Sequence, residues 1–273
     1  MIFRAMVSLR LRVILREVVD TSREAGIVFA GSGRANVGPT DMVEVSGVRR
    51  EESACVGRRP DGFSVTPMAS APSVGAWFAN AAQLEAASVH AFRILHDELL
   101  AHGAPERLAV AAERAARDEI RHAAMMRRLA RRYGASNVPE VDVQAKPDRS
   151  LDAIALENAV EGCVRETYGA VEAALQGERA TDPLVARIMR AIAHDEAKHA
   201  ELAWDVAAWA RNGLDVETRT AIDVAMHGAV SDLLRELRRD TDPSLARLAG
   251  LPSKRVAMHA ASALQAKLWA RAS

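Results

Sequence analysis

Apolar and polar positions follow a helical period over most of the chain, beginning near residue 73. Apolar side chains recur there every three or four residues, which is the pattern of amphipathic helices. Ser150 and the pair Asp182–Pro183 are typical of helix N-termini. Helices are therefore predicted over about 74–101, 105–133, 151–176, 183–212, 216–239 and 252–271.

The connections between the first four of these helices are short, long and short. Short loops join antiparallel neighbours. The long connection, 134–150, has 17 residues and can extend to roughly 56 Å, whereas the helix before it is about 43 Å long. The third helix can therefore run parallel to the second. The sequence predicts an all-α fold, in which a four-helix bundle with one long crossover is followed by two C-terminal helices.

The first 72 residues lack this regular pattern. Residues 26–72 are rich in Gly, Ser, Pro and charge, as linkers and poorly ordered segments are. We therefore divide the chain into an irregular, linker-like N-terminal arm (1–72), a four-helix bundle (73–213) and a C-terminal helical extension packed on the bundle (214–273).

Composition agrees with packed helices and excludes several classes of function. Apolar residues make up 49% of the chain but aromatic residues only 4%, which disfavours a sheet protein. Lys and Arg (36) balance Asp and Glu (36), so no overall charge favours nucleic acid, and no apolar run is long enough to span a membrane. Arginines interrupt the apolar stretch 1–19, unlike a secretory signal, and Cys55 and Cys163 form no disulfide framework. We expect a cytoplasmic protein.

Two predicted helices carry the same acidic and histidine motif. Glu119 and His122 lie three residues apart on the second helix, and Glu196 and His199 on the fourth. This spacing puts both side chains on one helix face, as binding to one first-row metal requires. With eight histidines in the chain, chance predicts roughly 0.6 such pairs, so one alone means little but the repeated motif, with its flanking aspartate, is informative.

Two more glutamates interrupt apolar stripes on the other two helices of the bundle. Glu85 and Glu161 each have apolar residues seven positions before and after them, which places them on the buried sides of their helices. Glu85 precedes Glu119 by 34 residues, and Glu161 precedes Glu196 by 35. The chain thus reads as a doubled helical hairpin. Four buried carboxylates would repel one another strongly, and two divalent cations would cancel their charge.

These residues resemble the ferritin-like superfamily of di-iron carboxylate proteins, in the branch with two Glu-x-x-His helices. That branch includes rubrerythrin-like proteins, bacterial multicomponent monooxygenases and tRNA hydroxylases of the MiaE type. The resemblance covers residues 76–211 and is carried by EAASVHAF, DEIRHA, EGCVRETYGA and DEAKHA. It implies a ferritin-like bundle that binds two iron ions, or two manganese ions, through Glu85, Glu119, His122, Glu161, Glu196 and His199.

The resemblance also suggests roles for residues around the ligands. Glu119 and Glu196 would bridge the metals, and Asp118 and Asp195 would hold the ligand histidines in the correct tautomer, with exposed helix-face acids as the alternative. Glu166 lies five residues after Glu161, about 140° around a regular helix, so it should miss the site unless a π-bulge brings it back. Tyr168 is close to the metals by position, although ordinary core packing explains it better.

The function implied by this resemblance is an oxidoreductase that activates dioxygen or peroxide at two iron ions. Its partners would be dioxygen or peroxide, an unknown small-molecule substrate and an external electron donor, with no nucleic acid or membrane; a homodimer is one assembly open to it. The alternatives are a protein that sequesters and oxidises iron without an organic substrate, and a bundle whose metals are mainly structural. Two Glu-x-x-His motifs favour the enzyme, because shell-forming ferritins usually show one.

Overall fold

The computed structural model describes residues 13–14, 16–17, 20–21, 57–60, 63, 73–135, 138, 141, 143 and 149–271. Most of the predicted N-terminal arm (1–72) and part of the predicted crossover loop therefore lie outside the described residues. The described elements are α2 (Val74–Ala101), α3 (Glu106–Arg132), α4 (Leu151–Glu157), the π-helix η1 (Asn158–Glu166), α5 (Thr167–Arg179), α6 (Pro183–Ala210), α7 (Val216–Glu236), the π-helix η2 (Leu245–Ala249), α8 (Lys254–Lys267) and the short 3₁₀ helix η3 (Trp269–Arg271).

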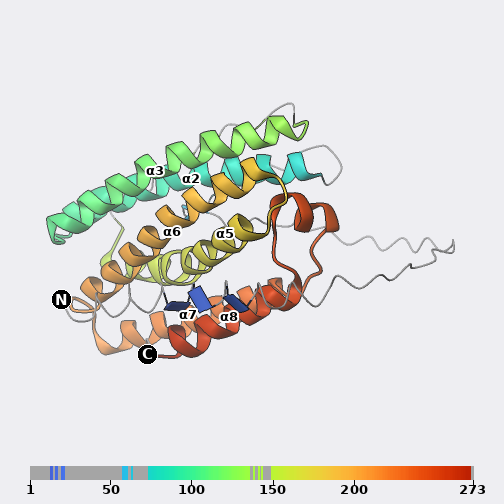
Figure 1. Cartoon of the computed structure of the whole chain (residues 1–273). Helices are drawn as coiled ribbons and strands as arrows, with labels where there is room; N and C mark the ends of the chain where they lie inside the picture. The colour runs from blue at the N-terminus through green and yellow to red at the C-terminus, as the bar shows by residue number, and fades with distance from the viewer. Residues whose placement is uncertain are drawn as a thin grey trace, which may run out of the picture.

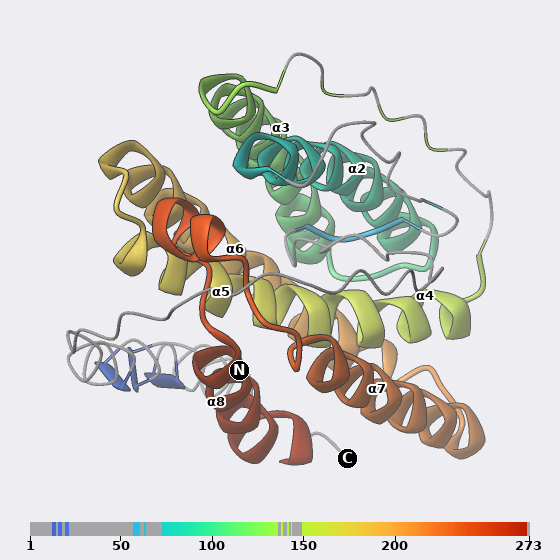
Figure 2. The same ribbon diagram turned by 90° about the vertical axis from the view of Figure 1, so that its right-hand side faces the viewer.

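The helices are stacked in three layers, which Figures 1 and 2 show from two directions. The hairpin of α2 and α3 forms one outer layer, α5 and α6 form the middle layer, and α7 and α8 form the other outer layer. Met126 near the end of α3 shares one apolar cluster with Ala173 of α5. Leu108 near the start of α3 shares another with Ile154 of α4, so α3 runs parallel to the continuous helix formed by α4, η1 and α5. The all-α fold with one long crossover is the predicted ferritin-like bundle, and the prediction is confirmed.

Local sequence signals explain where the bundle helices begin. Ser73 and Ser150 cap α2 and α4, because each hydroxyl accepts a hydrogen bond from the backbone N–H three residues later. Asp182 caps α6, because its Oδ1 accepts a hydrogen bond from the backbone N–H of Leu184, and Pro183 takes the first position of the helix. The structure differs from expectation at Pro105, which precedes α3 as its N-cap residue rather than opening the helix.

The bundle interior has two apolar ends with a polar layer between them. One end contains Phe78 of α2 with Met126 of α3 and Met189 of α6. The opposite end contains Phe92 of α2 together with Leu108 of α3 and other residues of α4 and α6. Since apolar packing at both ends fixes the three helices relative to one another, polar side chains in the middle of each helix are held in register.

The third bundle helix is not the regular α-helix that the sequence predicts. It is continuous from Leu151 to Arg179, but residues Asn158–Glu166 wind as a π-helix. A π-helix has more residues per turn than an α-helix, so it rotates every later side chain relative to the regular register. Val164 and Tyr168 stay buried as predicted, but the positions of the glutamates on this helix differ from those of a regular α-helix.

The C-terminal helices pack on the outer face of α5 and α6. Tyr168 and Trp204 from the bundle share an apolar cluster with Leu233 of α7, Leu264 of α8 and Trp269. Ile14, a described residue of the predicted arm, is 1% exposed in this same cluster. The sequence predicted α7 and α8 but not η2. None of the helices in the described ranges combines the length and apolar character needed for a bilayer span.

Candidate metal centre

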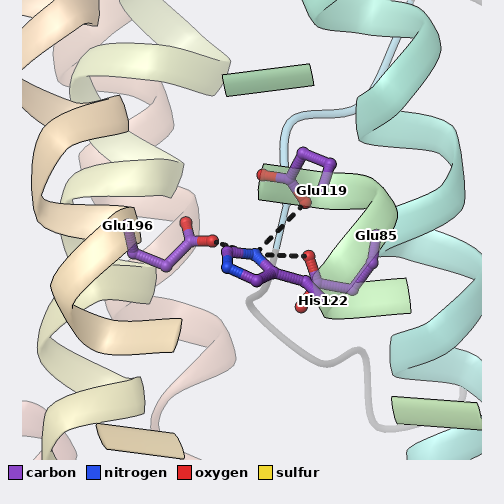
Figure 3. A group of neighbouring side chains, drawn as sticks. All are labelled: Glu85, Glu119, His122 and Glu196. Carbon is purple, nitrogen blue, oxygen red and sulfur yellow. Dashed lines mark ion pairs between the residues drawn. The ribbon is translucent and has the colours of Figure 1, made fainter. Parts of the chain in front are cut away.

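Four predicted ligands converge in the polar layer of the bundle, as Figure 3 shows. Glu85 comes from α2, Glu119 and His122 come from α3, and Glu196 comes from α6. One ligand atom of each lies within 4.8 Å of the others. All four side chains are buried, with exposures of 1% or less. Three separate helices therefore supply the hard oxygen and imidazole donors that first-row metals prefer.

His199, the fifth predicted ligand, joins this group from α6 and is 2% exposed. Its Nδ1 atom lies 3.1 Å from Oε1 of Glu119 and 3.6 Å from Oε1 of Glu196. Nδ1 of His122 lies 3.6 Å from Oε2 of Glu119 and 3.3 Å from Oε1 of Glu196. Glu119 and Glu196 thus stand between the two histidines, which is where carboxylates shared by two metals would have to be.

The two aspartates before the motif glutamates contact the histidines crosswise. Nε2 of His122 on α3 lies 3.5 Å from Oδ2 of Asp195 on α6. Nε2 of His199 on α6 lies 3.5 Å from Oδ2 of Asp118 on α3. Arg121 reaches both aspartates, at 2.7 Å and 3.0 Å. With a carboxylate beside each Nε2, both Nδ1 atoms are left facing the glutamates.

The structure does not bring Glu161 to this group. Glu161 is only half-buried, and its Oε2 accepts a hydrogen bond from the backbone N–H of Arg59 at 3.3 Å. Glu166 is instead 2% exposed and lies close enough to His199 and Glu196 to interact electrostatically with both. The reason is the π-helix η1, which carries Glu166 to the bundle interior and Glu161 away from it. Sequence reasoning allowed for this bulge but chose the wrong register.

The four buried glutamates fit a metal-binding role because the protein gives them little else to bind. Among the described residues, neither carboxylate oxygen of Glu85, Glu119, Glu166 or Glu196 has a hydrogen-bond partner. The Nδ1 atoms of both histidines also lack hydrogen-bond partners. Buried polar atoms are almost always paired in folded proteins. Buried acceptor atoms that lack hydrogen-bond partners and face one another are typical of a cation-binding site.

The pKa values of the carboxyl groups differ strongly from one another, because the groups are buried close together. Burial raises the pKa of Glu85 well above its usual value, and the charge of Glu119 raises it further. Burial also raises the pKa of Glu166, and the charge of Glu196 adds to the rise, against the opposing effect of His199. At Glu119, burial is outweighed by contacts with the two histidines, which hold its pKa far below the usual range.

The surrounding carboxylates raise the pKa of both histidines. Burial by itself lowers the pKa of His122, but contacts with Asp195 and the surrounding glutamates raise it well above the usual value. For His199, burial is likewise opposed by the charge of Glu196 and by Asp118, with the same result. Positive charge is therefore required at the centre of this bundle, and metal cations would supply it without protons.

A groove of about 520 Å³ lies between α3 and α6, at the edge of this centre. Its lining includes His199 and Asp118, next to the apolar side chains of Leu108 and Leu202. Several cationic side chains surround it, namely Arg107, Arg114, Arg117, Arg121 and Lys198. His199 is the candidate ligand that this groove contacts.

Tyr168 lies in the apolar cluster between the bundle and the C-terminal helices, as ordinary core packing would place it. It is fully buried there. Sequence reasoning missed a further residue near the centre, Arg58, which comes from the segment assigned to the linker-like arm. Its guanidinium lies 6.0 Å from the centre of the Phe92 ring, which is itself 5.0 Å from the ring of His199. Its only sequence signal is a GRRP run in a Gly-rich segment.

The fold and the ligand set together define a ferritin-like carboxylate protein with two Glu-x-x-His helices. Residues 78–207 match the rubrerythrin family model, so this part of the chain is a rubrerythrin-type domain, which implies a di-iron or related metal site. No curated protein and no solved structure showed significant similarity to the chain.

Proposed function

We propose that this protein is a non-haem di-iron oxidoreductase that activates dioxygen or peroxide. The observation that carries the proposal is the set of four glutamates and two histidines buried in the bundle without hydrogen-bond partners for their inward-facing atoms among the described residues. The rubrerythrin-type domain supports it, because that domain belongs to the di-iron carboxylate proteins. Iron rather than manganese, and oxidation rather than storage, are part of the proposal.

The arrangement of the ligands suggests which residues would hold each metal. Glu85 lies 3.8 Å from His122, and we assign this pair to one ion. On the other side of the centre, Glu166 interacts with His199, and we assign these two to the second ion. Glu119 and Glu196, between the histidines, would be shared. This assignment replaces Glu161, the ligand predicted from the sequence, with Glu166.

The bound ions would supply reversible electron transfer and open positions for an oxygen ligand. The protein itself would orient and enclose them. Asp118 and Asp195 lie 3.5 Å from the Nε2 atoms of the two imidazoles, where they would orient them. The apolar ends of the bundle exclude water from above and below, and the groove admits small molecules beside His199. Electrons would come from a small-molecule substrate or an external donor.

Anaerobic loading with ferrous iron tests the proposal. The chain should bind about two ions, because the paired motifs form a two-metal site. Mixing the loaded protein with dioxygen should then consume dioxygen repeatedly in the presence of a reductant while the iron content stays constant. Iron that instead accumulates far beyond two ions per chain would favour sequestration. A chain that keeps its two ions but does not react with dioxygen or peroxide would favour a structural role for the metals.

A further inference from the structure

A short segment from outside the rubrerythrin-type domain is fixed against the metal-binding bundle. This segment, Gly57–Pro60, is called the strap here, and it lies well before the matched residues 78–207. Ser88 of α2 donates a hydrogen bond from its Oγ to the backbone carbonyl of Arg58 at 2.9 Å. Gly57 has a φ of +78°, and a Cβ atom there would collide with Ser88. The strap is therefore shaped to approach α2 closely.

The side chain of Arg58 enters the bundle from this strap. It is 1% exposed, which is rare for arginine. Its Nε donates to Oε1 of Glu157 at 2.8 Å, and its Nη1 donates to Oδ1 of Asn158 at 3.1 Å. The third arm is different, because Nη2 has no hydrogen-bond partner within the described ranges. Leaving a buried donor of a charged group unpaired costs free energy, so we expect Nη2 to have an acceptor when the site is occupied.

The unpaired arm of Arg58 is close to the metal-binding residues. The guanidinium interacts electrostatically with Glu166, whose two oxygens also lack hydrogen-bond partners in the described structure. Phe92 is close to both Arg58 and His199, with its ring centre 6.0 Å from the guanidinium and 5.0 Å from the imidazole. Glu157 forms an ion pair with Arg58 and balances its charge. Nη2 therefore offers the metal centre a hydrogen-bond donor without adding net charge to it.

We propose that the strap completes the metal centre, and that Nη2 of Arg58 donates a hydrogen bond to a small anion bound at the metal pair beside Glu166 and His199. The inference rests on the proposed two-metal function. The chemistry of the donor defines the ligand class, since a fixed guanidinium favours compact anions with exposed oxygen or nitrogen lone pairs. Arg58 lies before the matched residues 78–207, so the family match by itself does not imply this donor.

Azide is a suitable probe, because it is a small anion whose binding to oxidised iron can be followed by its visible absorption. The full-length protein is loaded with iron, oxidised and titrated with azide, and its metal content is measured in parallel. Loss of one charge-assisted hydrogen bond should weaken binding about tenfold or more. We expect this loss in Arg58→Gln at an unchanged metal content. Arg58→Lys, which keeps the charge but not the forked donors, should also lose affinity.

Arg149→Gln is the matched control, because Arg149 also donates to Glu157, at 2.8 Å, but comes from the segment before α4. It should keep the azide affinity of the natural chain within about twofold, even if both substitutions lower the melting temperature. Unchanged azide affinity in metal-loaded Arg58→Gln would overturn the inference alone, and Arg58→Lys would decide the matter if Arg58→Gln failed to fold. A natural chain that binds no iron would overturn the proposed function as well.

Discussion

At the residue scale, the histidines of the candidate centre are held by the opposite helix rather than by their own. His122 of α3 contacts Asp195 of α6, and His199 of α6 contacts Asp118 of α3. The crossing links the two motif helices through the ligands themselves. The sequence suggested that these aspartates orient the histidines, but it could not show the exchange between helices, because that depends on how α3 and α6 face each other.

Removing one of these aspartates should weaken metal binding without destroying the bundle. Asp195→Ala removes the carboxylate that faces Nε2 of His122, and such outer contacts are typically worth 10–100-fold in metal affinity, so a loss of about that size is expected. Competition with a chelator of known affinity measures it. Asp97→Ala is the control, because Asp97 is an exposed side chain of α2 with 82% exposure. Equal affinities in the two variants would contradict an orienting role for Asp195.

The choice between Glu161 and Glu166 is the second prediction at this scale. Glu166→Ala should lose the second metal ion or bind it much more weakly. The substitution removes the one glutamate that we assign to the ion of His199 and that the two ions do not share. Glu161→Ala should retain about two ions, since its side chain binds the backbone N–H of Arg59 instead. Elemental analysis after anaerobic ferrous loading measures both. If Glu161→Ala lost an ion and Glu166→Ala did not, the metal-bound register of this helix would be that of a regular α-helix.

At the scale of single elements, the π-helix η1 is the feature that sequence periodicity could not locate. Apolar spacing predicted the start of the helix and placed its end at residue 176, three residues before Arg179. A local change in pitch, however, leaves the same apolar residues buried while moving the polar ones. The structure shows how this segment is anchored. Asn158 donates to the carbonyl of Ala203 on α6 at 2.9 Å, and the indole of Trp269 donates to the carbonyl of Cys163 at 2.9 Å. The C-terminal helices thereby support the ligand-bearing helix.

Trp269→Phe tests this support. The substitution keeps an aromatic ring in the apolar cluster but removes the donor to Cys163, so the free energy of unfolding should fall by about 1 kcal/mol. The second metal ion should also bind more weakly, because Glu166 lies in the same π-helix. Chemical denaturation and metal titration measure the two effects. Trp209→Phe serves as the comparison, since no hydrogen bond of its indole is found in the described part of the chain. The prediction is wrong if Trp269→Phe changes neither quantity more than Trp209→Phe does.

At the scale of the whole molecule, the three-layer arrangement places the ligand set between two apolar ends and beneath packed helices. Helix lengths, caps and loop lengths were enough to predict the bundle and its crossover. They could not predict that described parts of the N-terminal arm pack against it, through Arg58 in the bundle and Ile14 beside the C-terminal helices. The Gly-rich segment that carries Arg58 has no periodic pattern, and arginines interrupt the apolar stretch that carries Ile14. The contacts of both therefore depend on the surface that the helices create after folding.

The same arrangement leaves a groove between α3 and α6 that ends at His199, and we predict that metal ions leave the centre through it. Ala111 lines this groove, and Phe at that position should fill part of it while the ligands stay in place. We expect Ala111→Phe to bind about two ions, as the natural chain would, and to release iron to a small chelator several-fold more slowly. The rate is measured from the absorbance of the iron–chelator complex. Val110→Phe is the control, because Val110 is the preceding residue of α3 and lies outside the groove lining. Slower release in Ala111→Phe alone would identify the groove as the path to the metals, and equal rates in both variants and the natural chain would show that small molecules enter elsewhere.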